Sequence, residues 1–163
     1  MFEIDPEFQA AIPPLSETEL SILTESLKAE GCRESLLVWN GLLIDGHNRY
    51  EICTAHDIPF KTSRVYFASR TDALIWIKKN QLGRRNLTDY QRAEIALSLK
   101  EDLAKLARER QRGGPGGVLL TAKLPEANGE TRDALADMAG VSGRTLDKVE
   151  RIEAEAIKDR RPG

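Results

Sequence analysis

Residues 131–155 read TRDALADMAGVSGRTLDKVERIEAE and predict two short helices separated by a tight turn. Thr131 is placed to cap a first helix that ends before Gly140, and Ser142 is placed to cap a second helix that runs to about residue 155. Ala136 is small at a position where two helices must approach closely. The apolar residues available for a shared core are Leu135, Ala139, Val141, Leu146 and Val149. This spacing predicts a helix-turn-helix motif at residues 131–155.

The second of these helices carries the residues from which we expect DNA contacts. The recognition helix of such a motif presents its N-terminal half to the major groove. Arg144 is the best candidate for a base contact, because a guanidinium can donate two hydrogen bonds to guanine. Thr145 and Lys148 fit phosphate and base-edge contacts equally well. The DNA-contacting residues expected on this helix are Ser142, Arg144, Thr145, Lys148 and Arg151.

The alternative interpretation of the same residues is an ordinary helical hairpin. In that case Arg144 and Lys148 only solvate an exposed face. Asp147 and Glu150 lie in the same helix, and each would repel a nearby phosphate. The acidic residues therefore count against DNA binding.

A second group of basic residues lies before a long predicted helix. Arg84 and Arg85 precede it, and Arg92 lies in its first turn. A capping box at residues 88–91 begins this helix, and its apolar stripe comprises Ile95, Leu99, Leu103 and Leu106. Arginines at such a turn can hold phosphates without reading sequence. We expect Arg84, Arg85 and Arg92 to anchor a DNA backbone, with a solvated turn as the alternative.

The first 86 residues mix helices with short strands. Ser16 with Glu19 three residues later predicts a capping box. Asn40-Gly41 between two apolar runs predicts a tight β-hairpin, because both turn positions need positive φ. The expected elements are a helix at 16–31, a hairpin at 36–44, a helix at 46–58, a strand at 62–67 and a helix at 69–83. We therefore expect an α+β fold with a small mixed sheet, followed by an all-α domain.

Composition excludes several classes of protein. The chain has 163 residues and a net charge of −2, which fits a soluble protein of one or two small domains. It has no run of about 18 uncharged apolar residues and no secretory signal pattern, so we expect a cytoplasmic protein without a membrane segment. Two cysteines and two histidines give neither a disulfide framework nor zinc-finger spacing, and we expect no metal.

Charge is divided unevenly along the chain. Residues 1–60 contain eleven acids and three bases, whereas residues 61–112 contain thirteen bases and six acids. Such asymmetry favours a polyanionic partner for one part of the molecule. The alternative is that the acidic segment pairs with the basic one. Residues 111–129 are rich in glycine and are expected to form a mobile loop or linker.

Three stretches of this sequence resemble the ParB-like proteins that act in chromosome and plasmid partition, and especially their relatives on phages and mobile elements. The stretches are LKAEG at residues 27–31, LIDGHNRYE at 43–51 and NQLGRRNLT at 80–88. The resemblance implies a ParB/sulfiredoxin-like domain at residues 1–86 and a helical DNA-binding domain at residues 87–163. It also implies binding of double-stranded DNA and a role in partition, replication or gene regulation. Pairing into homodimers is an expectation from the reading of half-sites.

The resemblance also implies an alternative, nucleotide-dependent function. Partition proteins of this family hydrolyse CTP with a Gly-Glu-Arg-Arg stretch and a Glu-Asn pair. This chain has Gly46-His47-Asn48-Arg49 at the first position and a lysine before Asn80 at the second. Gly46, His47, Asn48, Arg49 and Asn80 are therefore the expected contacts of CTP or another nucleotide, with no metal ligand among them. The enzyme alternatives are a nucleotide hydrolase and a small-molecule kinase, the latter because related kinases carry Asp-Gly-His.

The oligomeric state is open at this point. Half-sites in DNA are usually read by dimers. Few residues follow residue 157, so a separate dimerisation domain of the kind that partition proteins carry does not fit there. We expect either a fragment of a longer protein or pairing through another surface.

Overall fold

The computed structural model describes residues 2–84, 86–112 and 130–159. The chain divides into two compact units between Ala73 and Leu74, within helix α4 (Arg70–Leu82). The boundary that the sequence predicts, after residue 86, stays a prediction. Most of the glycine-rich segment, residues 113–129, lies outside the described residues.

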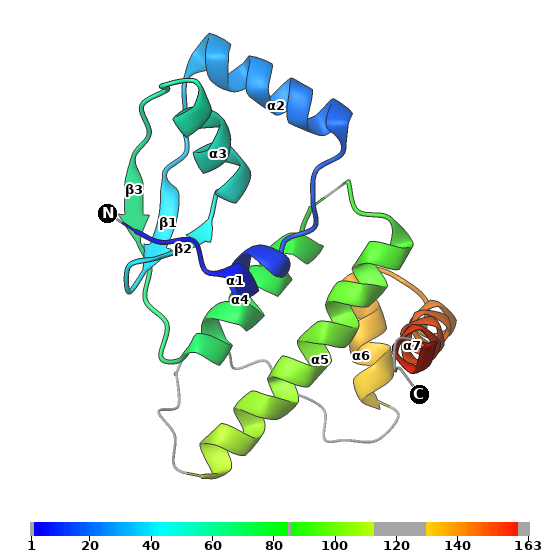
Figure 1. The fold of residues 1–163 in the computed structure, drawn as a ribbon. Helices are drawn as coiled ribbons and strands as arrows, with labels where there is room; N and C mark the ends of the chain where they lie inside the picture. Colours follow the sequence, from blue (N-terminus) through cyan, green and yellow to red (C-terminus); the bar gives the residue numbers. More distant parts are fainter. Residues whose placement is uncertain (1, 85, 113–129, 160–163) are drawn as a thin grey trace. The chain divides into compact units, whose positions relative to one another are not determined.

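The first unit combines a three-stranded sheet with short helices, which Figure 1 shows in blue to green. Its elements are α1 (Pro6–Ala10), α2 (Glu17–Glu30), β1 (Leu36–Trp39), β2 (Leu42–Asp45), α3 (His47–Ala55) and β3 (Thr62–Arg64). The Ser16 hydroxyl accepts the amide of Glu19 at 3.3 Å, and the Glu19 carboxylate accepts the amide of Ser16 at 2.9 Å. The capping box predicted for the start of α2 is therefore confirmed.

The sheet is mixed, with the strand order β2-β1-β3. β1 pairs with β2 antiparallel and with β3 parallel. Asn40 has a φ of 48° and Gly41 a φ of 79°, which confirms the predicted tight hairpin. β3 is shorter than the predicted strand at 62–67, because the register places Arg64 opposite Val38, near the end of β1.

Side chains from α2 and α3 form a small core in this unit. Leu27, Ile52 and Cys53 are buried together. Burial raises the pKa of the Cys53 thiol to about 11, which makes it a poor nucleophile near neutral pH. Cys53 is thus a buried small apolar residue, as the sequence predicts.

The second unit is helical. After the C-terminal part of α4 it contains α5 (Asp89–Gln111), α6 (Glu130–Ala139) and α7 (Gly143–Asp159). The predicted stripe of α5 is confirmed, since Ile95, Leu99, Leu103 and Leu106 are all buried in one cluster. A small mixed sheet with seven helices in the described part of the chain confirms the expected α+β class. No described helix is long and apolar enough to span a bilayer.

Two predicted helix boundaries in this unit are wrong. The backbone of α6 is already helical at Glu130, so Thr131 lies within the helix and is not its N-cap. α7 continues to Asp159, beyond the expected end near residue 155. The break between the two helices does lie where the sequence predicts it, because Gly140 adopts a φ of 65°.

Candidate nucleic-acid interface

α6 and α7 pack against α5, the three helices that Figure 1 draws in green, orange and red. A shared apolar core holds them together. The predicted core residues of the pair are buried in the same cluster as the stripe of α5, and Val141 packs against it. These residues are Leu135, Ala136, Ala139, Leu146 and Val149. Burial of such side chains fixes which face of α7 is turned away from the protein.

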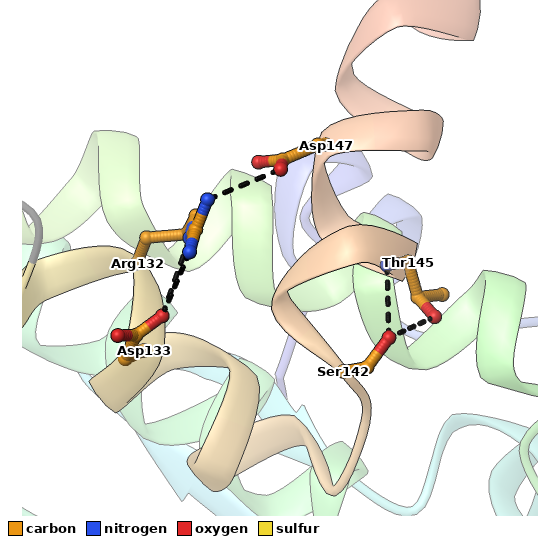
Figure 2. A network of polar contacts seen from close by, with 5 residues as sticks. All are labelled: Arg132, Asp133, Ser142, Thr145 and Asp147. Atoms are coloured by element: carbon orange, nitrogen blue, oxygen red, sulfur yellow. Dashed lines mark hydrogen bonds and ion pairs between the residues drawn. The ribbon is translucent and has the colours of Figure 1, made fainter.

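Hydrogen bonds order the turn before α7. The amide of Val141 donates to the carbonyl of Ala136 at 3.0 Å, as expected where a helix ends at a left-handed residue. The Ser142 hydroxyl accepts the amide of Thr145 at 3.2 Å and lies 2.9 Å from the Thr145 hydroxyl (Figure 2). Ser142 is therefore the N-cap of α7, as predicted.

Three basic side chains project from the first half of α7. Arg144, Lys148 and Arg151 are all exposed. Within the described residues, none of them makes a side-chain hydrogen bond or an ion pair. Their spacing of three and four residues places them on one side of the helix. Their positive charges are available to a ligand in solution.

The two acids in the same half of α7 are paired with other helices. Asp147 accepts from Arg132 of α6 at 3.2 Å, and Glu150 accepts from Lys100 of α5 at 3.3 Å. Both pairs are half-exposed, so each contributes little to folding stability. They matter for charge: each acid that would repel a phosphate has a cation beside it.

The second half of α7 has a different character. Glu153 is partly buried, and its burial together with Glu94, Glu101 and Glu150 nearby raises the pKa of its carboxyl. The grouped basic residues of α7 therefore lie in its first half, at residues 144–151, and the second half has a single lysine, Lys158, in its last turn.

Two of the three arginines expected to anchor a DNA backbone, Arg84 and Arg92, lie in the described part of the chain. The guanidinium of Arg92 donates to the carbonyl of Leu82 at 3.2 Å and to that of Arg84 at 2.9 Å. Arg92 thus satisfies the carbonyl of the last residue of α4 and one just beyond the helix, which is a structural role. Arg84 is half-buried, and Arg85 lies outside the described residues.

Sequence reasoning missed the two cations that pair with the acids of α7. Arg132 lies 15 positions before Asp147 and Lys100 lies 50 positions before Glu150. The partners meet only once the three helices have packed.

The turn at Gly46 has little room for a side chain. Gly46 adopts a φ of 96°, and a Cβ there would lie 2.5 Å from Leu36 Cδ2 and 3.3 Å from Arg49 Nη2. It is the N-cap of α3, and no side chain caps that helix. Asp45 pairs with Arg49 at 2.8 Å and does not cap α3.

Arg49 is fully engaged within the protein. Its guanidinium pairs with Glu34 at 2.6 Å as well as with Asp45, and its side chain is only 15% exposed. Of the other predicted nucleotide contacts in this unit, Asn48 is half-buried and His47 is buried. Asn80 is exposed and belongs to the second unit.

His47 has no visible partner for either ring nitrogen among the described residues. Burial lowers the pKa of His47, and the nearby Asp45 carboxylate opposes that shift only in part. The imidazole is therefore neutral at pH 7. A neutral imidazole can accept or relay a proton but brings no positive charge to an anion.

Comparison with known proteins identifies the fold. No protein-family model matches the chain, and no curated protein matches it either. Two solved structures of a pNOB8-like ParB N-domain are similar over 91% of this chain, with TM-scores of 0.65 and 0.61 and sequence identities of 18% and 17%. The chain spans 64% and 59% of the length of those two structures. The resemblance to ParB-like proteins is thereby confirmed in the fold: this chain has the fold of a ParB N-domain.

Proposed function

We propose that this chain is a DNA-binding protein of ParB-like architecture, in which α6 and α7 act as a helix-turn-helix motif. The first half of α7 enters the major groove of double-stranded DNA. The process it serves is plasmid, phage or mobile-element partition, replication or gene regulation, which places the protein in the cytoplasm.

The observation that carries the proposal is the distribution of paired and unpaired charges on α7. Its three exposed bases have no described partner, whereas both acids beside them are paired with other helices. An ordinary solvated helix face gives no reason for this division. Binding of a polyanion is favoured by it, because free cations gain from phosphate contact and unpaired acids lose.

Each side chain has a defined part in the proposal. Arg144 reads a guanine with two hydrogen bonds, and Lys148 and Arg151 contact phosphates or base edges. Ser142 and Thr145 lie at the N-terminus of α7, where backbone amides and hydroxyls suit a phosphate oxygen. Of the proposed backbone anchors, Arg84 and Arg85 are the stronger, because Arg92 already donates to two carbonyls.

The test is a titration of fluorescently labelled duplex DNA at several salt concentrations. We expect affinity to fall steeply as salt rises, since bound phosphates release counterions. Arg108→Ala is a matched control for Arg144→Ala, because Arg108 is also an exposed arginine in the second unit and bonds only to the carbonyl of Ala104 among described residues. Affinity that is independent of salt, or equal losses for both variants, would contradict the proposal.

Half-site reading also requires two copies of the motif. We propose a homodimer on DNA, since operators read by this motif are usually palindromic. Selection of bound duplexes from a random pool tests this directly. Selected sequences with two inverted half-sites support a dimer, and a single asymmetric site contradicts it.

A nucleotide-dependent enzyme centred on residues 46–49 is the second candidate. The uncapped N-terminus of α3 and the unpartnered ring of the buried His47 favour it. The two ion pairs of Arg49 count against it, because this arginine would have to leave both acids to reach a phosphate. Calorimetric titration with CTP, with and without magnesium, decides the matter: binding heat supports this candidate and its absence removes it.

A further inference from the structure

Asp147 lies between two exposed arginines of its own helix. Arg144 is three residues before it and Arg151 is four residues after it. Oppositely charged side chains at these spacings are neighbours on a helix surface and pair readily. Asp147 pairs with neither of them in the described structure, and its carboxylate accepts from Arg132 of α6 instead.

The side chain of Arg132 lies close to the first residue of α7. Its guanidinium bonds to Asp147 with Nη1 and to Asp133 with Nε and Nη2, each at 3.2 Å (Figure 2). A Cβ on Gly143 would lie 3.1 Å from Arg132 Nε. The missing side chain of Gly143 therefore leaves the space in which this arginine lies against the first turn of α7. Asp133 fixes the guanidinium from the other side.

We infer that Arg132 is a positioning residue for the DNA-binding face of α7, a role that rests on the proposed function. By holding Asp147 toward α6, Arg132 keeps Arg144 and Arg151 unpaired and free for DNA. Without Arg132, Asp147 turns to one of these two arginines. DNA must then compete with an acid for the same guanidinium.

Three variants separate this role from the alternatives: R132Q, D147N and the double variant. We expect R132Q to weaken duplex binding by roughly two- to fivefold, the range of an exposed ion pair of this kind. D147N should bind at least as tightly as the parent, because it removes the competing acid. The double variant should bind as tightly as D147N. R132K retains a cation beside Asp147 and should bind more tightly than R132Q.

Two outcomes would overturn the inference. If Arg132 itself contacts a phosphate, R132Q lowers the slope of log affinity against log salt by about one and D147N does not restore binding. If Arg132 only stabilises the fold, R132Q lowers the melting temperature and the double variant binds no better than R132Q. Measuring the salt slope and the melting temperature of the parent, R132Q, D147N and the double variant therefore distinguishes the three roles.

A second measurement does not depend on DNA. The side-chain Nε–H resonances of Arg144 and Arg151 report on their pairing by NMR. We expect R132Q to shift at least one of them and the double variant to return it to its position in D147N. Unchanged resonances in R132Q would overturn the inference. If the parent protein fails to bind duplex, the proposed function fails, while these resonances still report whether Arg132 controls the pairing of Asp147.

Discussion

The turn at residues 45–49 and the first half of α7 both place an arginine near the N-terminus of a helix, but they use it in opposite ways. At the turn, Arg49 is mostly buried and is held by Asp45 and Glu34. In α7, Arg144 is exposed, and the neighbouring acid Asp147 pairs with Arg132 of α6. The comparison teaches that a count of basic residues does not locate an anion-binding surface. The candidate surface is a helix face where several unpaired cations lie together and the neighbouring acids are paired with other helices.

The largest effect is expected at the turn, from Gly46→Ala. Its left-handed φ strains any other residue, and the new Cβ would clash with Leu36 Cδ2 at 2.5 Å. We expect a loss of about 2–4 kcal/mol in the free energy of unfolding, measured by urea denaturation.

Gly41→Ala is the matched control for that variant. Gly41 also has a positive φ, of 79°, but its Cβ would meet nothing within 4 Å. This variant should lose only about 1 kcal/mol in the free energy of unfolding, the cost of placing alanine at a positive φ. Equal losses for both variants would show that the packing against Leu36 does not matter.

The next largest effect is expected on the other region, from Arg144→Ala. Loss of a two-bond contact to guanine should weaken binding to a selected duplex by roughly 1–3 kcal/mol and relax the preference at that base. Competition titration with single-base variants of the duplex measures both. An equal loss of affinity for all sequences would assign Arg144 to phosphate contacts. The control variant Arg108→Ala should bind like the parent.

Acid should destabilise the fold through His47. Burial lowers its pKa in the folded protein below the ordinary value of 6.5, so the unfolded chain binds the proton more readily. The neutral imidazole therefore contributes its full stability above about pH 6.5, and that stability is lost as the pH falls toward the folded pKa. Urea denaturation at pH 7.5 and pH 5.5 measures this loss. His47→Gln should lose less between the two pH values, and an unchanged difference would assign the loss to other groups.

The smallest effect is expected from Lys100→Gln. It removes the cation beside Glu150 in a half-exposed pair. The free energy of duplex binding should weaken by roughly a few tenths of a kcal/mol, because the unpaired Glu150 carboxylate then repels the phosphates more strongly. Lys105→Gln changes the same charge on an exposed face of α5 without a described partner and serves as the control. Equal effects of the two variants would show that only net charge matters.

Local features of this fold were predictable from the sequence. The capping box of α2 and the tight turn at Asn40-Gly41 depend on residues within a few positions of one another. The stripe of α5 and the buried residues of α6 and α7 follow from helical periodicity. These patterns need no knowledge of tertiary structure.

The charge pairing of the candidate site was not predictable in the same way. Asp147 and Glu150 counted against DNA binding in the sequence, and only the packed helices bring Arg132 and Lys100 to them. Likewise, the sequence places Arg92 where a phosphate contact is expected, but in the structure it donates to the carbonyl of Leu82 at the end of α4. Long-range ion pairs depend on how helices pack, which residue spacing alone does not reveal.

We expect the first half of α7, and not the turn at Gly46, to meet DNA. The most direct measurement is the change in backbone amide NMR signals when duplex DNA is added to the protein. We predict that the signals of residues 142–151 shift while those of residues 46–49 stay in place. Shifts confined to residues 46–49, or none in α7, would contradict the account.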